Sequence, residues 1–426
     1  MSESNESAPA APGDSRWRRA TDSLRNRQFR RLFVGNLAFF LAMGGQGLIR
    51  PWIALELTDD PFALGLTGAA MALPMFFLSP LGGALADRVD RRNLIAGALS
   101  MALLTETIIY VLLVTERIEF WHLVVGSACL GACFPLQMPA RAAIVANLVE
   151  RKRLGAAMGV NMTGMNLTQM VGPAMAGMLA SGVGIEGAYA FNLGLYVIAI
   201  GATFSVGAAP PALRSTVSLL ENVLEGFRYL RSDRMVALLL LFGLVPQFLA
   251  MPFQQVLPVF ARDVWVVGPS GLGILSTSVG IGAMVGSMYI ATRDQQKARL
   301  PLMMSSLVVF CVLIAAFALS GSFWLGVVLA FVGNIGGSIF RTVNNVAIQL
   351  VIPDEVRGRV SSFLMMSVSL PLLGGLPVTW VTRTYGAPTA VSGACVLALV
   401  LGIAFVLGSS SLRRVDDRVR AKLAEA

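Results

Sequence analysis

Apolar residues along this chain are gathered into long windows separated by short polar segments. A helix needs about 20 predominantly apolar residues to cross the hydrocarbon core of a bilayer, and twelve such windows can be drawn. They cover residues 32–56, 63–86, 93–114, 121–142, 157–181, 187–208, 236–260, 270–291, 301–320, 323–346, 360–381 and 387–408. The pattern therefore predicts an all-α membrane protein with twelve transmembrane helices.

Composition and charge extend this prediction to an orientation. Hydrophobic residues make up 55% of the chain and charged residues 13%, whereas soluble domains carry about 25% charged residues. Of the 33 Lys and Arg residues, 27 fall in the two tails and in the loops after spans 2, 4, 6, 8 and 10. Only Arg117, Arg262 and Arg383 occupy the opposite loops. Because Lys and Arg concentrate on the cytoplasmic side, both termini are predicted to be cytoplasmic. The net charge of +9 then needs no nucleic-acid partner.

The loop between the second and third windows carries the most informative local pattern. It combines glycine, leucine, an acid and three arginines at Gly83, Leu85, Asp87, Arg88, Arg91 and Arg92. Asp87, at the end of a span, can pair with an arginine or a helix terminus and so hold two helices together. An alternative is that the arginines only set topology.

This loop resembles the one between spans 2 and 3 of major facilitator superfamily transporters, with Asp90 where the family usually has glycine. The resemblance implies the major facilitator fold, with two six-helix halves that expose a central site to alternate sides. It also implies that the 83–92 loop latches one end state, and that a monomer is the usual arrangement.

A long polar interruption divides the chain into two halves. We expect a cytoplasmic tail over 1–31, a six-helix half over 32–209, a linker over 210–235, a second half over 236–408 and a basic tail over 409–426. Residues 139–156 parallel residues 339–359, with Arg141 matching Arg341. The second-half loop motif consists of Asp354, Arg357, Gly358 and Arg359. Together with 24–32, 225–229 and 257–263, it resembles a bacterial branch that includes macrolide efflux proteins and the enterobactin exporter.

Polar side chains inside the apolar windows are candidates for a transport pathway, because they are costly in lipid. The candidate cavity residues are Gln46, Arg50, Gln137, Arg141, Asn161, Asn166, Gln169, Gln247, Gln254, Arg341, Asn345 and Gln349. The superfamily resemblance implies that spans 1, 2, 4, 5, 7, 8, 10 and 11 line a central cavity. A role as polar contacts between helices is the alternative for about half of these residues.

Glu106 is the one acid well inside a predicted span, so we expect it to be paired, with Arg50 as a candidate, or protonated. It is the first candidate for proton coupling, and Glu56 is the second. Gly172, Pro173 and Gly177 resemble the Gly-Pro element of exporting antiporters. Drug–proton antiporters often have an arginine in span 4 where this chain has Ser127, which argues against coupling by that route.

These features predict a secondary carrier that exports a hydrophobic or amphipathic small molecule by alternating access, through proton-coupled antiport. We expect it in the bacterial cytoplasmic (inner) membrane, in contact with lipid. No cofactor, metal site, nucleotide-binding loop or enzyme domain is predicted. An importer or lipid-moving carrier of the same fold remains an alternative, as does a non-transporting receptor or scaffold.

Overall fold

The computed structural model describes residues 24–86, 88–150, 153–209, 228, 231–292, 299–352 and 366–419. Every regular element in these residues is helical. The helices of the first half are α2 (Arg27–Thr58), α3 (Phe62–Ala86), α4 (Arg91–Val114), α5 (Phe120–Leu148) and α6 (Leu154–Phe204). Those of the second half are α8 (Arg234–Leu249), α9 (Phe253–Val259), the π-helix η2 (Phe260–Val264), α10 (Gly268–Ala291), α11 (Leu300–Ala318), α12 (Phe323–Val351), α14 (Leu370–Tyr385), α15 (Ala387–Gly408) and α16 (Ser410–Arg413).

Ten candidate membrane spans among the described residues are long and apolar enough to cross a bilayer. Two predicted spans, 157–181 and 187–208, correspond to the two helical stretches on either side of a kink in α6, and the second prediction runs four residues past the end of α6 at Phe204. Gly184 interrupts it with φ of 81° and ψ of 168°, a backbone conformation that glycine adopts without strain. The predicted span 360–381 overlaps α14, whose described helix has 16 residues. The count of twelve spans therefore stays a prediction.

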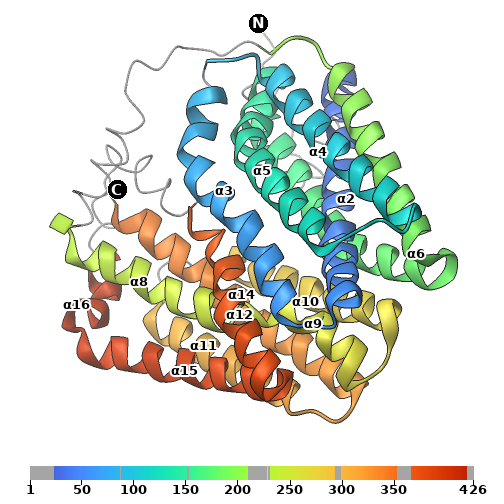
Figure 1. Ribbon diagram of the computed structural model, residues 1–426. Helices are drawn as coiled ribbons and strands as arrows, with labels where there is room; N and C mark the ends of the chain where they lie inside the picture. Colours follow the sequence, from blue (N-terminus) through green and yellow to red (C-terminus); the bar gives the residue numbers. More distant parts are fainter. Residues whose placement is uncertain are drawn as a thin grey trace, which may run out of the picture.

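The helices form two groups, one containing α2 to α6 and the other α8 to α16 (Figure 1). In the first, α2 packs on α6 and α3 packs on α5; in the second, α12 packs on α10 and α11. The most extensive contacts between the groups are those of α3 with α14 and of α6 with α10; α2 also contacts α9 and α10, and α3 contacts α9. Any central site therefore lies between these contacts.

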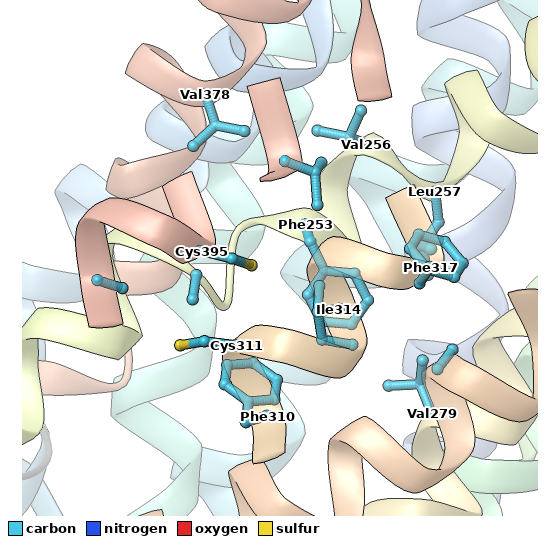
Figure 2. Packing of buried hydrophobic residues seen from close by; sticks show 14 of the residues in the cluster. Phe253, Val256, Leu257, Val279, Phe310, Cys311, Ile314, Phe317, Val378 and Cys395 are labelled. Carbon is cyan, nitrogen blue, oxygen red and sulfur yellow. The ribbon is translucent and has the colours of Figure 1, made fainter. Parts of the chain in front are cut away.

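The core of the second half includes aromatic and aliphatic side chains of α9, α10, α11, α14 and α15 (Figure 2). The Phe253 ring lies against Phe310 and Phe317, with centroids 6.2 and 6.0 Å apart. Cys311 and Cys395 are free thiols that are 1% exposed and pack as small apolar groups. This packed core gives the second half a rigid wall.

The ends of the two groups differ from the predicted tails. α2 begins at Arg27 instead of residue 32, because Asn26 accepts hydrogen bonds from the amides of Gln28 (2.9 Å) and Phe29 (3.2 Å) as an N-cap. Residues 409–419 lie on the second half, with Leu412, Val415 and Val419 fully buried. Arg418 forms an ion pair of 2.5 Å with Asp233, at the start of α8.

Candidate functional site

A cavity of about 690 Å³ lies between the two halves. Six of the twelve predicted cavity residues line it: Gln46 and Arg50 of α2, Asn166 and Gln169 of α6, Gln254 of α9, and Arg341 of α12. Five methionines, Met43, Met71, Met170, Met251 and Met284, supply much of the apolar surface between them. The wall thus combines amides, arginines and flexible thioethers, a mixture that suits an amphipathic ligand.

Arg50 belongs to a buried hydrogen-bonded group that reaches from the cavity wall into the first half. Its Nη2 lies 2.5 Å from Oε1 of Glu106, and its Nη1 donates to Ser127 Oγ at 3.0 Å. Glu106 Oε2 also accepts from Gln46 Nε2 at 2.8 Å and from the Tyr189 hydroxyl. Three helices, α2, α4 and α6, therefore meet at one carboxylate, and α5 is joined to the group through Arg50.

The burial of this group explains its composition. Glu106 is 0% exposed and Arg50 is 6% exposed, so each would be severely destabilising alone. A buried ion pair is tolerated when further hydrogen bonds satisfy most of its remaining atoms. Gln46, Ser127 and Tyr189 supply such bonds here, although Arg50 Nε has no partner among the described residues. Tyr189 was missing from the sequence prediction because a tyrosine in an apolar window is indistinguishable from an ordinary core residue.

A second buried group surrounds Arg141 in the first half. Arg141 donates through Nε and Nη2 to Gln137 Oε1, at 3.1 and 3.0 Å, and through Nη1 to Asn36. Asn36 donates in turn to Asn161 at 2.7 Å, and the guanidinium lies 4.2 Å from the centre of the Phe39 ring. Gln137, Arg141 and Asn161 thus belong to one hydrogen-bonded group joined through Asn36, and none of them lines the cavity.

Arg341, the second-half counterpart of Arg141, has a different environment. It is accessible in the cavity and makes no hydrogen bond or ion pair with any residue that the structure describes. The position four residues before it is Gly337, where Arg141 has Gln137. A Cβ at Gly337 would lie only 2.8 Å from the Phe310 ring, so close packing there leaves no room for an amide side chain.

The other predicted polar residues lie away from the cavity. Gln247 donates to the Gly243 carbonyl of its own helix at 3.4 Å. Asn345 and Gln349 follow Arg341 on α12, but neither lines the cavity. Glu56 is exposed and accepts from the Trp52 indole at 2.6 Å. In this conformation it has no contact with the group around Glu106.

The loop after α3 is tied to its own half. Asp90 caps α4 by accepting from the amides of Arg92 and Asn93, and its other oxygen accepts from the Ala209 amide at 3.1 Å. Arg91 donates to Asn147 at 3.0 Å, and Arg92 donates to the Val206 carbonyl at 3.3 Å. The aspartate that departs from the family pattern is therefore an N-cap, a role that aspartate at the start of a helix could have predicted.

The remaining residues of the two predicted loop motifs are exposed, lie at the end of α3 or lie outside the described residues. Leu85 and Arg88 are exposed, and Gly83 lies in the last turns of α3. Asp87, Asp354, Arg357, Gly358 and Arg359 lie outside the described residues. The role of the 83–92 loop as a latch for one end state therefore stays a prediction.

The glycines of the Gly-Pro element lie at close helix contacts, Gly172 within the first half and Gly177 between the halves. A Cβ at Gly172 would be 2.9 Å from the Leu41 carbonyl oxygen of α2. A Cβ at Gly177 would be 2.5 Å from the Pro269 carbonyl oxygen of α10. Thr277 of α10 also donates to the Met170 carbonyl of α6 at 3.1 Å. Glycine is required at these positions because the helix backbones approach closely.

Charged groups join the halves where α2 ends and α3 begins. Arg262 of η2 donates to the Leu55 carbonyl oxygen at 2.8 Å and to Asp59 at 2.6 Å. Arg383 of α14 lies 3.5 Å from Asp60. We call these four charged residues the 59–60 latch, because two acids of the first half are held by two arginines of the second.

Comparisons with known proteins agree with this architecture. The profile of a family described as transmembrane secretion effector matches residues 19–424. The enterobactin exporter EntS of Escherichia coli O1:K1 is 25% identical over 406 residues, covering 91% of this chain and 92% of the exporter. EntS of Citrobacter koseri is 25% identical over 405 residues, with the same coverage.

Solved transporters share the fold at low sequence identity. The nucleoside transporter NupG superposes with a TM-score of 0.71 at 16% identity, over 89% of this chain and 98% of that one. A bacterial homologue of the human lysosomal transporter Spinster, inward-facing and unoccupied, gives a TM-score of 0.71 at 14% identity, over 94% and 98%. Proteins of this kind move solutes and are not enzymes. The chain belongs to the transmembrane secretion effector family, a bacterial branch of the major facilitator superfamily of transporters.

Proposed function

We propose that this protein is a secondary active exporter that moves an amphipathic small molecule by alternating access. The observation that carries the proposal is the cavity of about 690 Å³ between two halves that meet at the 59–60 latch and at the α6–α10 contact. A cavity closed at one end by breakable contacts between rigid halves can change the side to which it opens. The name of the EntS relatives supports export as the direction.

Proton antiport is the coupling that the site supports best. Among the described residues Glu106 is the only buried acidic side chain, and its partner Arg50 lies on the cavity wall. Loosening of the Arg50–Glu106 pair during the conformational change would let Glu106 take up and release a proton. Ser127 occupies the span-4 position at which related antiporters often have arginine, and here it accepts a hydrogen bond from Arg50 of α2. The positive charge next to Ser127 is therefore supplied by Arg50 of α2, and not by an arginine of span 4.

The cellular setting follows from the charge distribution. We place both termini in the cytoplasm and the chain in the bacterial cytoplasmic membrane as a twelve-span monomer, because Lys and Arg concentrate on one side. In this orientation the 59–60 latch closes the outer side. The 83–92 loop, including Asp87, would then latch the inner side in the opposite state.

Efflux from pump-deficient bacteria tests the proposal. The panel comprises lipophilic dyes, antibiotics and enterobactin, and the variants are Glu106→Gln and Asp87→Asn. Glu186→Gln, which changes an exposed acid, is the matched control. We expect efflux that a protonophore abolishes and that both test variants reduce at equal expression.

Everted membrane vesicles give a readout that does not depend on any variant. Addition of a transported compound should drive proton movement that a pH-sensitive dye reports. Efflux that persists with a protonophore present and with Glu106→Gln would refute proton coupling. Absence of efflux for every compound, from protein shown to be in the membrane, would refute export of this class of molecule.

A further inference from the structure

The cavity wall carries an unbalanced positive charge. Arg50 and Arg341 are the only charged residues on it within the described part of the chain. Glu106 neutralises Arg50 across 2.5 Å. Arg341 has no acidic partner among the described residues, so the cavity has one uncompensated cation.

A comparison of the two repeats indicates that this cation is not needed for packing. Arg141 is 3% exposed and is held by Asn36, Gln137 and the Phe39 ring. Arg341 has none of these contacts, and Gly337 stands where a supporting amide would be. The guanidinium of Arg341 is therefore free to bind something in the cavity, with its donors arranged to match a carboxylate, sulfonate or phosphate.

The opposite wall offers two hydrogen-bonding atoms that have no partner among the described residues. Gln46 Oε1 and Arg50 Nε are buried and have no hydrogen-bond partner among the described residues. They belong to cavity-lining side chains one turn apart on α2, one acting as acceptor and the other as donor. A hydroxyl group can satisfy both, because it donates and accepts at once.

From these observations we infer that the substrate is an organic anion: an amphipathic molecule whose negative group pairs with Arg341 and whose polar body contacts the α2 wall. Methionines Met170, Met251 and Met284 then contact its apolar part. This inference rests on the proposed function and names the substrate class of the same cavity.

Two probes that differ only in charge test the inference. 8-Anilinonaphthalene-1-sulfonate carries a sulfonate, and N-phenyl-1-naphthylamine has the same ring system without it. Binding to the full chain in zwitterionic nanodiscs is measured by equilibrium dialysis, with empty nanodiscs subtracted. A hydrogen-bonded ion pair is worth about tenfold in affinity or more. We expect the anionic probe to bind at least that much more tightly.

Substitutions of Arg341 test whether this residue causes the preference for the anionic probe. Arg341→Gln should abolish the preference for the anionic probe and leave the affinity for the neutral probe within about twofold. Arg341→Lys should retain most of the preference because the positive charge is kept. Asn166→Ala, a neutral change on the opposite wall, should affect both probes alike. Equal binding of the two probes, or a preference that survives Arg341→Gln, would overturn the inference.

Transport assays separate this inference from the proposed function. Charge-dependent binding in a protein that moves none of the compounds would refute the exporter and leave the anion site standing. Efflux of neutral, cationic and anionic compounds at equal rates would support the exporter and refute the anion site.

Discussion

Glu106 shows how a single residue in an apolar window organises its surroundings. Its two oxygens accept from Arg50, Gln46 and Tyr189, which belong to two other helices. Removal of one partner from a buried ion pair is costly because the remaining charge stays buried without compensation.

We therefore expect Glu106→Gln to lower the free energy of unfolding by about 3–5 kcal/mol, since Arg50 would remain charged. The double replacement Arg50→Met with Glu106→Leu should recover most of this loss, because neither charge is left. Thermal unfolding of the purified protein in detergent measures both effects. Tyr189→Phe is the control, with an expected loss of about 1 kcal/mol for one hydrogen bond. A single variant as stable as the unchanged protein would contradict the prediction.

Sequence reasoning identified several residues of the site, but it could not separate those that line the cavity from those that bind other helices. Gln46, Arg50, Asn166, Gln169, Gln254 and Arg341 could be selected because polar groups are rare in lipid-facing windows. The same criterion also selected Gln137, Arg141 and Asn161, which belong to one buried group joined through Asn36. The two classes can be separated only when the neighbouring residues on other helices, such as Asn36 and Phe39, are known. No local sequence pattern predicts these neighbours.

At the scale of elements, the contact between α6 and α10 depends on glycine. Gly177→Ala should destabilise the protein by about 1–3 kcal/mol, because the added methyl group would meet the Pro269 carbonyl oxygen. Gly182→Ala, on the same helix with nothing within 4 Å of its Cβ, should be neutral or stabilising by about 0.5–1 kcal/mol. Thermal unfolding of the two variants side by side measures the difference, and equal effects would show that the contact is loose.

The segment 409–419 should detach from the second half in acid. Burial alone would raise the pKa of Asp233, but hydrogen bonds from Arg418 and from the Val236 amide lower it below its ordinary value of 3.8. Because its pKa is lowered in the folded protein, Asp233 stabilises the docked segment at pH values above its ordinary pKa. This stabilisation is lost as the pH falls through the lowered pKa of the folded state.

Hydrogen exchange of residues 409–419 between pH 6 and pH 3 measures this loss, after correction for intrinsic rates. Asp233→Asn, which keeps an N-cap side chain and removes the charge, should give faster exchange already at pH 6. Unchanged protection in that variant would show that Leu412, Val415 and Val419 hold the segment without the ion pair.

At the scale of the whole molecule, the 59–60 latch should set the balance between conformations. Arg262→Gln with Arg383→Gln removes both cations that join α2 and α3 to the second half. We expect longer distances between spin labels at exposed positions 116 and 319, in a background without the four native cysteines. Partly exposed ion pairs are each worth about 1 kcal/mol or less, so the shift should be partial. Arg117→Gln, in the first half alone, should leave the distances unchanged.

The helices of the whole molecule could be predicted from hydropathy, but the pairing of distant helices could not. Most predicted windows match a helix within a few residues. The windows 157–181 and 187–208 are separated by the kink at Gly184, which lies in the predicted gap between them. The pairing of α3 with α14 could not be predicted from local patterns, because the two helices are about 300 residues apart in the sequence (Figure 1).

The contrast between Arg141 and Arg341 has a consequence for evolution and engineering. Replacement of Arg141 would disturb Asn36, Gln137 and Phe39 together, so the first repeat has little freedom to change there. Arg341 can be replaced at small cost to folding, because no described side chain depends on it. Selection for a new cargo can therefore proceed through the second repeat while the first keeps the scaffold intact. A library of substitutions for directed evolution belongs on the α12 face of the cavity.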